Sequence, residues 1–494
     1  MTLLNVDDVR IDPAVALKLP PGLALRRKVL PFAIAEGLVH VACADPHDES
    51  AFQSVEKYLG CPVRPEPAEA ASLMRALDRV YGDMPGSLDA RGRPRSVDLK
   101  NATELQLQDV VAIGDELLHA AALRQASDIH LDPEPSSLHV RFRVDGTLET
   151  YRRLPANAAI SLVSRFKVLA GLDIAEKRAP QDGGFKHRYG RTGQTIDIRV
   201  ATLPTKYGER VTLRLLALQT EGLSLERLGM CPRDLGEFER ALDLPHGMIL
   251  LTGPTGSGKT TTLYAAIRRI LAREPLNVIT VEDPIEYEIP GAAQVEVDSA
   301  DKVPFGKALR SVLRHDPDVV MIGEVRDAET ADVAIKASLT GHLVFSTLHT
   351  NSAASVITRL ADMGVERYLV AATLRMAIAQ RLVRRLCHRC RKPRELAERE
   401  AAAIAMPEAA GRTVFDAAGC LYCGGHGHVG RVGLFELLPV TEEWSRFIVS
   451  GVEEPELLAK MRERRIPRLM DDGAAKLFDG TISIRDLMSA VAEW

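Results

Sequence analysis

The pattern G-x-x-x-x-G-K-T lies in the middle of the chain, at Gly253-Pro254-Thr255-Gly256-Ser257-Gly258-Lys259-Thr260. An apolar run from Met248 to Thr252 precedes it, and a segment of helical spacing from Thr260 to Ala272 follows. Between a strand and a helix, such glycines let backbone N–H groups curve around phosphates, and the helix N-terminus adds a partial positive charge. The pattern therefore predicts a phosphate-binding loop at the edge of an α/β sheet.

The segments around this loop predict the sheet that carries it. Apolar runs at Asn277–Val281, Asp318–Gly323 and His342–Thr347 lack period-2 alternation, and helical segments separate them. Such runs are typical of parallel strands buried on both faces. Lys259 is expected to reach the β- and γ-phosphates, and Thr260 is expected to ligate Mg²⁺. The expected nucleotide-binding residues are Gly253, Pro254, Thr255, Gly256, Ser257, Gly258, Lys259, Thr260 and Thr261.

Carboxylates follow two of these apolar runs, at the position where open α/β sheets bind their ligands. After the first run, Glu286 is the candidate that positions or activates an attacking water. After the second, Glu324 is expected to reach the Mg²⁺ shell beside Thr260. A solvated acidic turn is the alternative for each segment. The residues expected to support the site are Glu282, Asp283 and Arg326.

Two histidines flank the run at residues 343–347, and their spacing fits opposite ends of one strand. His342 and His349 are both candidates for sensing phosphate or coupling subunits, with a structural role as the alternative. Arginines are candidates for stabilising charge on the γ-phosphate, either within a subunit or from its neighbour. Surface ion pairs are the alternative for them. The candidate arginines are Arg199, Arg214, Arg310 and Arg314.

Four of the seven cysteines form two C-x-x-C pairs, Cys387 with Cys390 and Cys420 with Cys423. Four thiolates with no open position match a closed, structural Zn²⁺ site, and free thiols or a redox pair are the alternative. The spacer between the pairs exceeds the usual length, and a helix is expected in it from Arg394 to Met406.

Pattern and composition changes divide the chain into six parts. Alternating strands at Gln194–Val200 and Arg210–Leu216 predict an antiparallel sheet with helices on its apolar face and arginines on its polar face. The predicted parts are an N-terminal docking domain at 1–82, a linker at 83–101, the arginine-bearing α/β domain at 102–219, the parallel-sheet domain at 220–386, a tetracysteine module at 387–424 and a helical segment at 425–494.

The composition is that of an ordinary soluble protein, with a net charge of −4. This charge argues against a nucleic-acid or anionic-lipid binder. No run approaches the roughly 18 apolar residues of a membrane span, and the first residues lack a signal-peptide pattern. We therefore expect a cytoplasmic protein that reaches a membrane only through a partner.

From Ala126 onward, the motifs resemble those of the bacterial secretion and type IV pilus assembly ATPases. Two segments, Val281–Glu288 and Ala379–Cys387, are most similar to the type II secretion traffic ATPases. The sequence departs from the pattern of this family at Gly184, where the family usually carries arginine. Besides the phosphate loop, the motifs that carry the resemblance are residues 126–130, 142–146, 172–178, 282–286, 323–327 and 346–351.

The resemblance implies a RecA-like ATPase domain preceded by a PAS-like α/β domain and a small α/β docking domain, with a zinc-binding insertion and a helical C-terminal segment. It implies ATP, Mg²⁺ and Zn²⁺ as ligands, with ATP bound between a subunit's two domains. It also implies a homo-hexamer, peripheral at the cytoplasmic face of the inner membrane, in which Arg199 and Arg214 act on the nucleotide. The first domain would dock on an inner-membrane secretion protein.

Three other functions are compatible with these motifs. The first is extension of a type IV pilus in place of type II secretion. The second is a DNA-uptake or conjugative translocase, which the acidic net charge disfavours. The third is a nucleotide-binding scaffold that does not hydrolyse ATP, and the presence of Glu286 and Glu324 argues against it.

Overall fold

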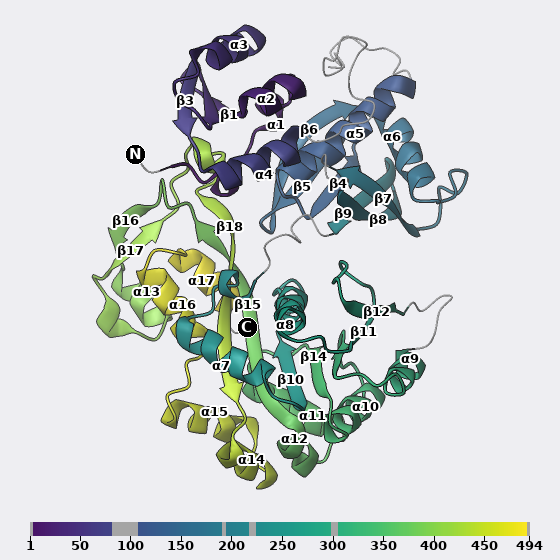
Figure 1. The fold of residues 1–494 in the computed structure, drawn as a ribbon, viewed down its shortest axis with the longest axis vertical. Coiled ribbons are helices and arrows are strands. Elements are labelled where there is room, and N and C mark those ends of the chain that lie inside the picture. The colour runs from purple at the N-terminus through teal and green to yellow at the C-terminus, as the bar shows by residue number, and fades with distance from the viewer. Residues whose placement is uncertain (1–2, 82–106, 190–193, 217–223, 298–304, 492–494) are drawn as a thin grey trace. The chain divides into compact units, whose positions relative to one another are not determined.

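The computed structural model describes residues 3–81, 107–189, 194–216, 224–297 and 305–491 (Figure 1). The chain divides into two compact units. The first comprises residues 1–218 with 389–391 and 417–430, and the second comprises the other residues. The linker predicted at 83–101 lies outside the described residues.

The N-terminal part of the first unit is a small α/β domain. Its first two strands form a hairpin, in which they pair antiparallel with Ala35 opposite Leu38. A third strand, parallel to the second, was not predicted. The elements are η1 (Val6–Asp8), α1 (Pro13–Ala16), α2 (Pro21–Arg27), β1 (Val29–Ala35), β2 (Leu38–Cys43), α3 (Glu49–Leu59), β3 (Val63–Pro67) and α4 (Ala70–Tyr81).

The rest of the first unit is mainly a six-stranded antiparallel sheet of order β6-β5-β4-β9-β8-β7. Its alternation is as predicted, since Ile198 and Leu213 are buried whereas Arg199 and Arg214 are exposed. The buried side chains form one core with those of two helices. The elements are α5 (Leu107–Leu123), β4 (Asp128–Pro133), β5 (Ser137–Val144), β6 (Thr147–Pro155), α6 (Ala156–Leu169), β7 (Gln181–Tyr189), β8 (Gln194–Thr205) and β9 (Gly208–Leu216).

The second unit is built on a seven-stranded sheet of order β12-β11-β13-β14-β10-β15-β18. The elements from residue 224 to the middle of this sheet are η2 (Leu225–Arg227), α7 (Pro232–Leu242), β10 (Gly247–Thr252), α8 (Lys259–Arg273), β11 (Val278–Glu282), β12 (Ala292–Glu296), α9 (Phe305–Val312), β13 (Val319–Ile322), α10 (Ala328–Leu339) and β14 (Leu343–Leu348). Neighbouring strands from β12 to β15 run parallel. This confirms the prediction for β10, β11, β13 and β14, whereas β12 was not predicted.

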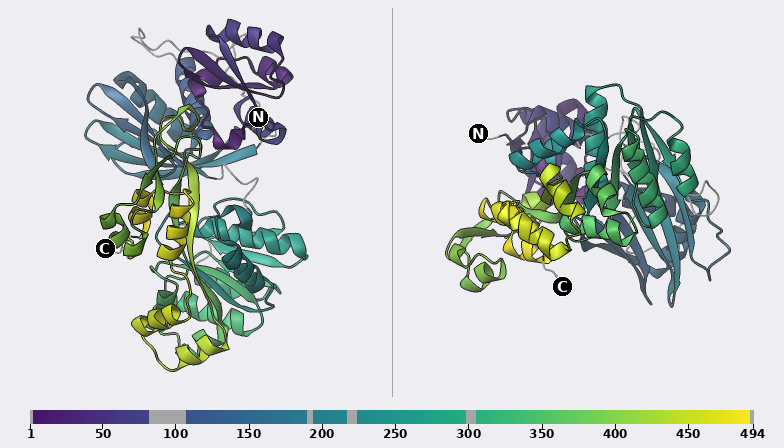
Figure 2. Two further views of the ribbon diagram at one scale, coloured as in Figure 1. Left: turned by 90° about the vertical axis from the view of Figure 1, so that its left-hand side faces the viewer. Right: turned by 90° about the horizontal axis from the view of Figure 1, so that it is seen from below.

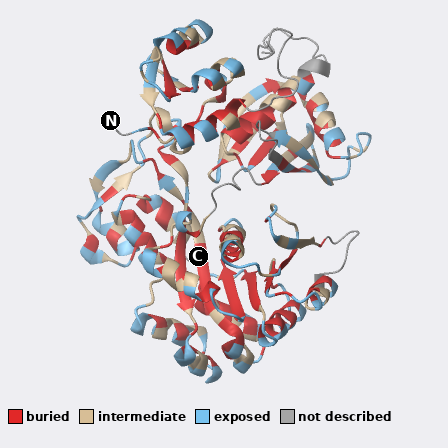
Figure 3. Ribbon diagram, in the orientation of Figure 1, coloured by how far each residue is buried: buried red, intermediate tan, exposed pale blue. Residues whose placement is uncertain are grey.

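This sheet is buried on both faces, and β10, β13 and β14 are buried along their whole length (Figure 3). On β10, Met248 and Leu250 belong to one core cluster, whereas Ile249 and Leu251 belong to another. Alternate side chains therefore enter two cores, which is why the runs are apolar without alternation.

The C-terminal part adds two strands to the sheet that the sequence did not predict, β15 and β18. The predicted helix from Arg394 to Met406 is partly wrong, because its first residues form a strand paired with β17. The elements are α11 (Ala354–Asp362), α12 (Arg367–Thr373), β15 (Leu374–Leu386), β16 (Lys392–Glu395), α13 (Glu398–Ala403), η3 (Pro407–Ala409), β17 (Thr413–Asp416), η4 (Leu421–Cys423) and β18 (His428–Pro439).

Helices follow β18, so the helical segment predicted at 425–494 is confirmed from Glu442 onward but is wrong at its start, where His428–Pro439 forms a strand. Helices α14 and α15 lie against α12 and α11, and α16 and α17 lie against β15 (Figures 1 and 2). Their bounds are α14 (Glu442–Val449), α15 (Glu454–Glu463), α16 (Leu469–Phe478) and α17 (Ile484–Val491). Among the described residues, no helix has both the length and the apolar character needed to cross a membrane.

Candidate active site and metal centre

The phosphate loop joins β10 to α8 and needs glycine at defined places. Gly253, Gly256 and Gly258 all have positive φ, a region that side chains other than glycine rarely adopt. A Cβ at Gly253 would meet the backbone oxygen of Gln380 at 2.4 Å, and one at Gly258 would meet its side-chain amide at 2.9 Å. At these two positions, glycine also allows the loop to lie directly against β15.

Lys259, the first residue of α8, is 8% exposed and folds back over the loop. Its Nζ donates to the carbonyl oxygens of Gly253 at 2.7 Å and Pro254 at 3.1 Å. Burial lowers the pKa of Lys259, and the neighbouring carboxylate of Glu324 acts in the opposite direction. The ammonium group is therefore held among loop carbonyls, beside an acidic side chain.

Charged side chains gather at the carboxyl ends of β11, β13 and β14. Glu324 follows β13, and its carboxylate pairs with Arg326 and lies 3.2 Å from the His349 imidazole. Arg326 also lies 3.8 Å from the Asp283 carboxylate. Since the strands are parallel and in register, these loops all emerge at the same edge as the phosphate loop. The structure thus brings Glu324, Arg326, Asp283 and His349 together.

The two remaining acidic candidates have different environments. Glu282 is 2% exposed, and its carboxylate accepts hydrogen bonds from Tyr264, Thr280 and Gln294. Both oxygens are used inside the core, so the geometry does not favour the expected support of a metal ion. Glu286 is half-buried in the loop after β11. This carboxylate therefore remains the candidate for activating water.

The two histidines lie at opposite ends of β14. His349 follows the strand and contacts Glu324, whereas His342 precedes it. The Nδ1 atom of His342 lies 2.8 Å from the carbonyl oxygen of Ala337, at the end of α10. The six-residue strand spans roughly 20 Å. The structure therefore does not bring His342 to the phosphate loop of its own chain.

Three arginines of the antiparallel sheet belong to one row of register partners that crosses five strands. Arg143, Asp128, Arg214, Arg199 and Gly184 are successive register partners on β5, β4, β9, β8 and β7. Asp128 lies 2.9 Å from the Arg214 guanidinium and 3.8 Å from that of Arg143. In the part of the chain that the structure describes, no side chain pairs with Arg199. This exposed cation is thus available to a ligand.

The other two candidate arginines lie on the surface at α9. Arg310 pairs with Glu329 at 2.5 Å, and both side chains are more than half exposed. Arg314 donates to the carbonyl oxygen of Arg310 and to the Ser311 hydroxyl. The structure does not place either of them in the charged cluster beside the phosphate loop.

Two residues of β15 that the sequence reasoning missed border the phosphate loop. Gln380 is 1% exposed and accepts from the Thr262 hydroxyl at 2.9 Å. Arg381 donates to the Asn351 side chain at 3.2 Å and lies 3.1 Å from the Cβ position of Gly253. A Gln-Arg pair interrupting an apolar run was the available indication. It was missed because this segment was not predicted to be a strand.

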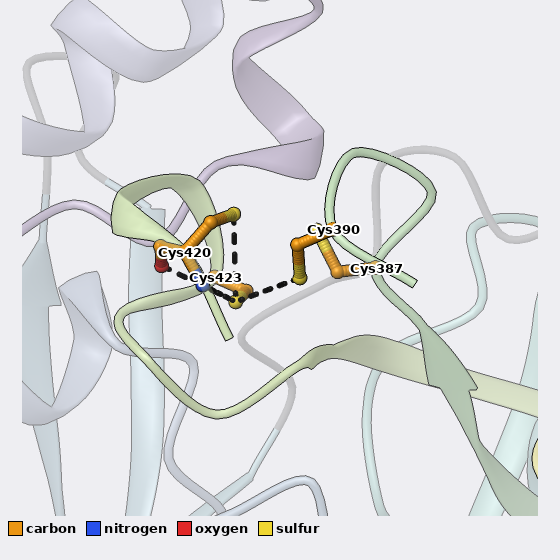
Figure 4. Close-up of side chains that lie close together, drawn as sticks. All are labelled: Cys387, Cys390, Cys420 and Cys423. Carbon is orange, nitrogen blue, oxygen red and sulfur yellow. Dashed lines mark hydrogen bonds between the residues drawn. The ribbon is translucent and has the colours of Figure 1, made fainter. Parts of the chain in front are cut away.

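The four cysteines of the two C-x-x-C pairs converge, with their sulfur atoms all within 4.8 Å of one another (Figure 4). Cys423 Sγ lies 3.9 Å from Cys390 and 3.7 Å from Cys420. Four thiolates about 2.3 Å from a Zn²⁺ ion have sulfur–sulfur edges of about 3.8 Å, whereas a disulfide requires about 2.05 Å. The donor set therefore fits a tetrahedral zinc ion and not a disulfide.

Backbone amides donate hydrogen bonds to one of these sulfur atoms. The amides of Cys420 and Gly427 donate to Cys423 Sγ at 3.2 and 3.1 Å. Burial by itself raises the pKa of the Cys423 thiol, but these hydrogen bonds, together with those to the Cys420 and Cys390 thiols, outweigh it and hold the pKa below its ordinary value. Hydrogen bonds that stabilise the thiolate also favour a metal-bound sulfur.

Side chains between the cysteines connect this loop to the N-terminal domain within the first unit. The Tyr422 hydroxyl donates to the Glu66 carboxylate at 2.9 Å. The Tyr422 ring contacts Phe32, with 5.8 Å between centroids, and the Arg389 guanidinium lies 4.1 Å from its centroid. The loop that carries Cys420 and Cys423 is therefore packed against structured elements.

A phosphate loop with carboxylates at the same edge of a parallel sheet defines a nucleoside triphosphatase of the phosphate-loop class. Residues 104–489 match the family described as Type II/IV secretion system protein, and residues 1–87 match the MshEN domain. The first match spans most of the chain, so the protein belongs to the type II/IV secretion system protein family. Site and family together identify an ATPase.

Relatives and solved structures agree with this assignment. The chain is 40% identical to type II secretion system protein E of Pseudomonas aeruginosa, over 100% of both chains. It is 36% identical to the type IV pilus assembly ATPase PilB of Myxococcus xanthus, over 99% of this chain and 88% of that one. The crystal structure of the pilus retraction motor PilT with bound ADP matches with a TM-score of 0.53 and 27% identity, over 78% of this chain and 97% of that chain.

The cysteine geometry predicts about one zinc ion per chain in freshly purified, reduced protein. Cys420→Ser should lose most of this zinc, because three thiolates and a hydroxyl bind the ion far less tightly. Inductively coupled plasma mass spectrometry measures the ratio, with Cys61→Ser, which lies outside the cluster, as the control. Wild-type protein with well under one zinc per chain would contradict the assignment.

Proposed function

We propose that this ATPase hydrolyses ATP to drive pseudopilus assembly and protein export by a type II secretion system. Hydrolysis is supported by the convergence of the phosphate loop, Glu324 and the Glu286 loop at one edge of the sheet. Secretion is favoured by the similarity to type II secretion system protein E over the whole chain. Type IV pilus assembly is the second candidate, since the similarity to PilB also spans nearly the whole chain.

In the proposed reaction, the backbone N–H groups of the loop and Lys259 bind the phosphates of ATP. Glu286 accepts a proton from a water molecule as the water oxygen attacks the γ-phosphorus, and ADP leaves with its β-phosphate oxygen. Mg²⁺, held through Thr260 and Glu324, supplies positive charge to the phosphates when it is bound. His349 and Arg326 orient the Glu324 carboxylate by their contacts with it.

The same proposal includes a homo-hexamer, with Arg199 and Arg214 acting on the nucleotide either within a subunit or from its neighbour. The exposed guanidinium of Arg199, which pairs with no side chain in the described ranges, supports this role. Arg214 shares Asp128 with Arg143, so it is held in place but still 65% exposed. Gly184, the register partner of Arg199, has no side chain, so Arg199 and Arg214 supply the positive charge at this end of the row. An isolated subunit would then be a poor ATPase.

We further propose a cytoplasmic protein, peripheral at the inner membrane, that docks on an inner-membrane secretion protein through residues 1–82. The match of residues 1–87 to a separate domain family supports an independent role for this part. The net charge of −4 argues against a DNA translocase, and Glu286 with Glu324 argues against a scaffold that does not hydrolyse ATP.

Glu286→Gln should lower kcat by at least about 100-fold while ATP binding is retained, because glutamine cannot accept the proton. Phosphate release measures turnover, and a fluorescent ATP analogue measures binding. Glu288→Gln, an exposed neighbour, is the control and should leave both unchanged. Unchanged turnover in Glu286→Gln would remove the assignment of the base.

Arg199→Ala should lower kcat by about 10³-fold, the effect typical of an arginine that stabilises the transferring phosphate. Lys186→Ala removes a 75% exposed cation from the same face of the neighbouring strand β7 and should have little effect. Both are assayed at equal oligomeric state. Equal turnover in the two variants would show that Arg199 is only a surface charge.

The docking proposal predicts that a type II secretion inner-membrane protein co-purifies with the full-length chain from cells that contain the secretion system. Removal of residues 1–82 should abolish this capture without abolishing nucleotide binding. Mass spectrometry of the captured proteins identifies the partner. Recovery of a type IV pilus platform protein in its place would favour pilus assembly.

A further inference from the structure

A buried hydroxyl connects the helix of the phosphate loop to the loop that carries Glu286. Tyr264 lies on α8, five residues after Lys259, and is fully buried. Its hydroxyl donates to the Glu282 carboxylate at the end of β11. The same oxygen accepts the backbone N–H of Glu286 at 3.3 Å. A single side chain thus joins α8, β11 and the candidate catalytic loop.

The Glu282 carboxylate extends this connection to the next strand. Its second oxygen accepts from the Thr280 hydroxyl at 2.6 Å and from the Gln294 amide on β12 at 3.1 Å. The Gln294 amide also donates to the carbonyl oxygen of Tyr287 at 3.1 Å and accepts the N–H of Ile289 at 2.7 Å. The network therefore holds the loop after β11 at three backbone positions, those of Glu286, Tyr287 and Ile289.

Ring packing reinforces the same attachment. The rings of Tyr264 and Tyr287 meet edge to face, with centroids 4.4 Å apart. The Arg268 guanidinium, also on α8, lies 5.8 Å from the Tyr287 centroid. Burial, together with the Glu282 carboxylate, raises the pKa of the Tyr264 phenol, so it stays protonated and remains a donor. Loop and helix are thereby fixed to one another.

A buried polar network can serve stability alone, but this network contacts the loop that carries Glu286. Besides the Glu282 carboxylate, the Tyr264 hydroxyl bonds to the backbone N–H of Glu286, the residue assigned as the base. Tyr264 itself lies on α8, and the first residue of this helix is Lys259, which is proposed to bind the phosphates. The network thus links the backbone of Glu286 to the helix that begins with Lys259.

We propose that Tyr264 and Glu282 are positioning residues, which hold the Glu286 loop in fixed register with the phosphate-loop helix. The proposal rests on the function proposed above for Glu286. A displacement of about 1 Å in a catalytic group costs about 10²-fold in rate. Loss of the hydroxyl should therefore affect the chemical step and leave nucleotide binding, which depends on the phosphate loop, unchanged.

The test is Tyr264→Phe in the full-length chain, which keeps the ring and removes the hydroxyl. We expect kcat to fall by about 10- to 100-fold, with KM and the affinity for a fluorescent ATP analogue within about twofold of wild type. Tyr287→Phe is the matched control. The Tyr287 hydroxyl is buried and has no hydrogen-bond partner among the described residues, so its removal breaks no bond.

A kcat for Tyr264→Phe equal to that of Tyr287→Phe would overturn the proposal. Parallel losses of kcat and nucleotide affinity would also overturn it, because they indicate a purely structural role. If Tyr264→Phe does not fold, Glu282→Gln is judged by the same criteria, since an amide has one acceptor oxygen and cannot accept from both the Tyr264 hydroxyl and the Gln294 amide. Normal turnover in Glu286→Gln would remove the function proposed for the base, whereas an inactive Glu286→Gln with an unaffected Tyr264→Phe would remove only the positioning role.

Discussion

The close approach of the phosphate loop to β15 is the constraint on which the nucleotide site depends. At Gly253 a side chain would collide with the backbone of Gln380, so the loop touches this strand directly. Strand β10 lies between β14 and β15, at the point where the chain, after building strands on one side, crosses to the other. At such a switch point the loops diverge and leave space for a ligand. The strand order therefore creates the site, and glycine keeps it open.

The polar groups around this site depend on burial. A carboxylate inside a core is costly unless its oxygens are hydrogen-bonded, and Glu282 receives three donors. These donors lie on α8, β11 and β12. The hydrogen bonds that the buried Glu282 carboxyl group needs therefore hold these three elements together. Glu324 has a different environment, with a half-buried carboxylate between Arg326 and His349. One acidic residue thus joins elements of the core, whereas the other lies among charged side chains at the edge of the sheet that carries the phosphate loop.

In the antiparallel sheet, register has a similar effect on arginines. Period-2 alternation places every arginine of the row on the polar face, and strand pairing brings them side by side. Adjacent like charges repel, and Asp128 offsets this between Arg143 and Arg214. Arg199 lies beyond its reach. Among the described residues of this row, Arg143 and Arg214 therefore share the Asp128 carboxylate, whereas Arg199 has no acidic partner.

The sequence by itself determined the phosphate loop, the parallel strands β10, β11, β13 and β14, the alternating strands of the antiparallel sheet and the cysteine pairs, because short motifs and local periodicity carry that information. It did not reveal β12, or β15 and β18, where polar residues interrupt the apolar pattern, or the strand Lys392–Glu395, which overlaps the start of a predicted helix. It also grouped Glu282 with the metal-supporting carboxylates and His342 with His349. Only the tertiary structure separated these pairs, because burial and strand direction decide which side chains face the core, which reach the loop and which lie at the far end of the sheet.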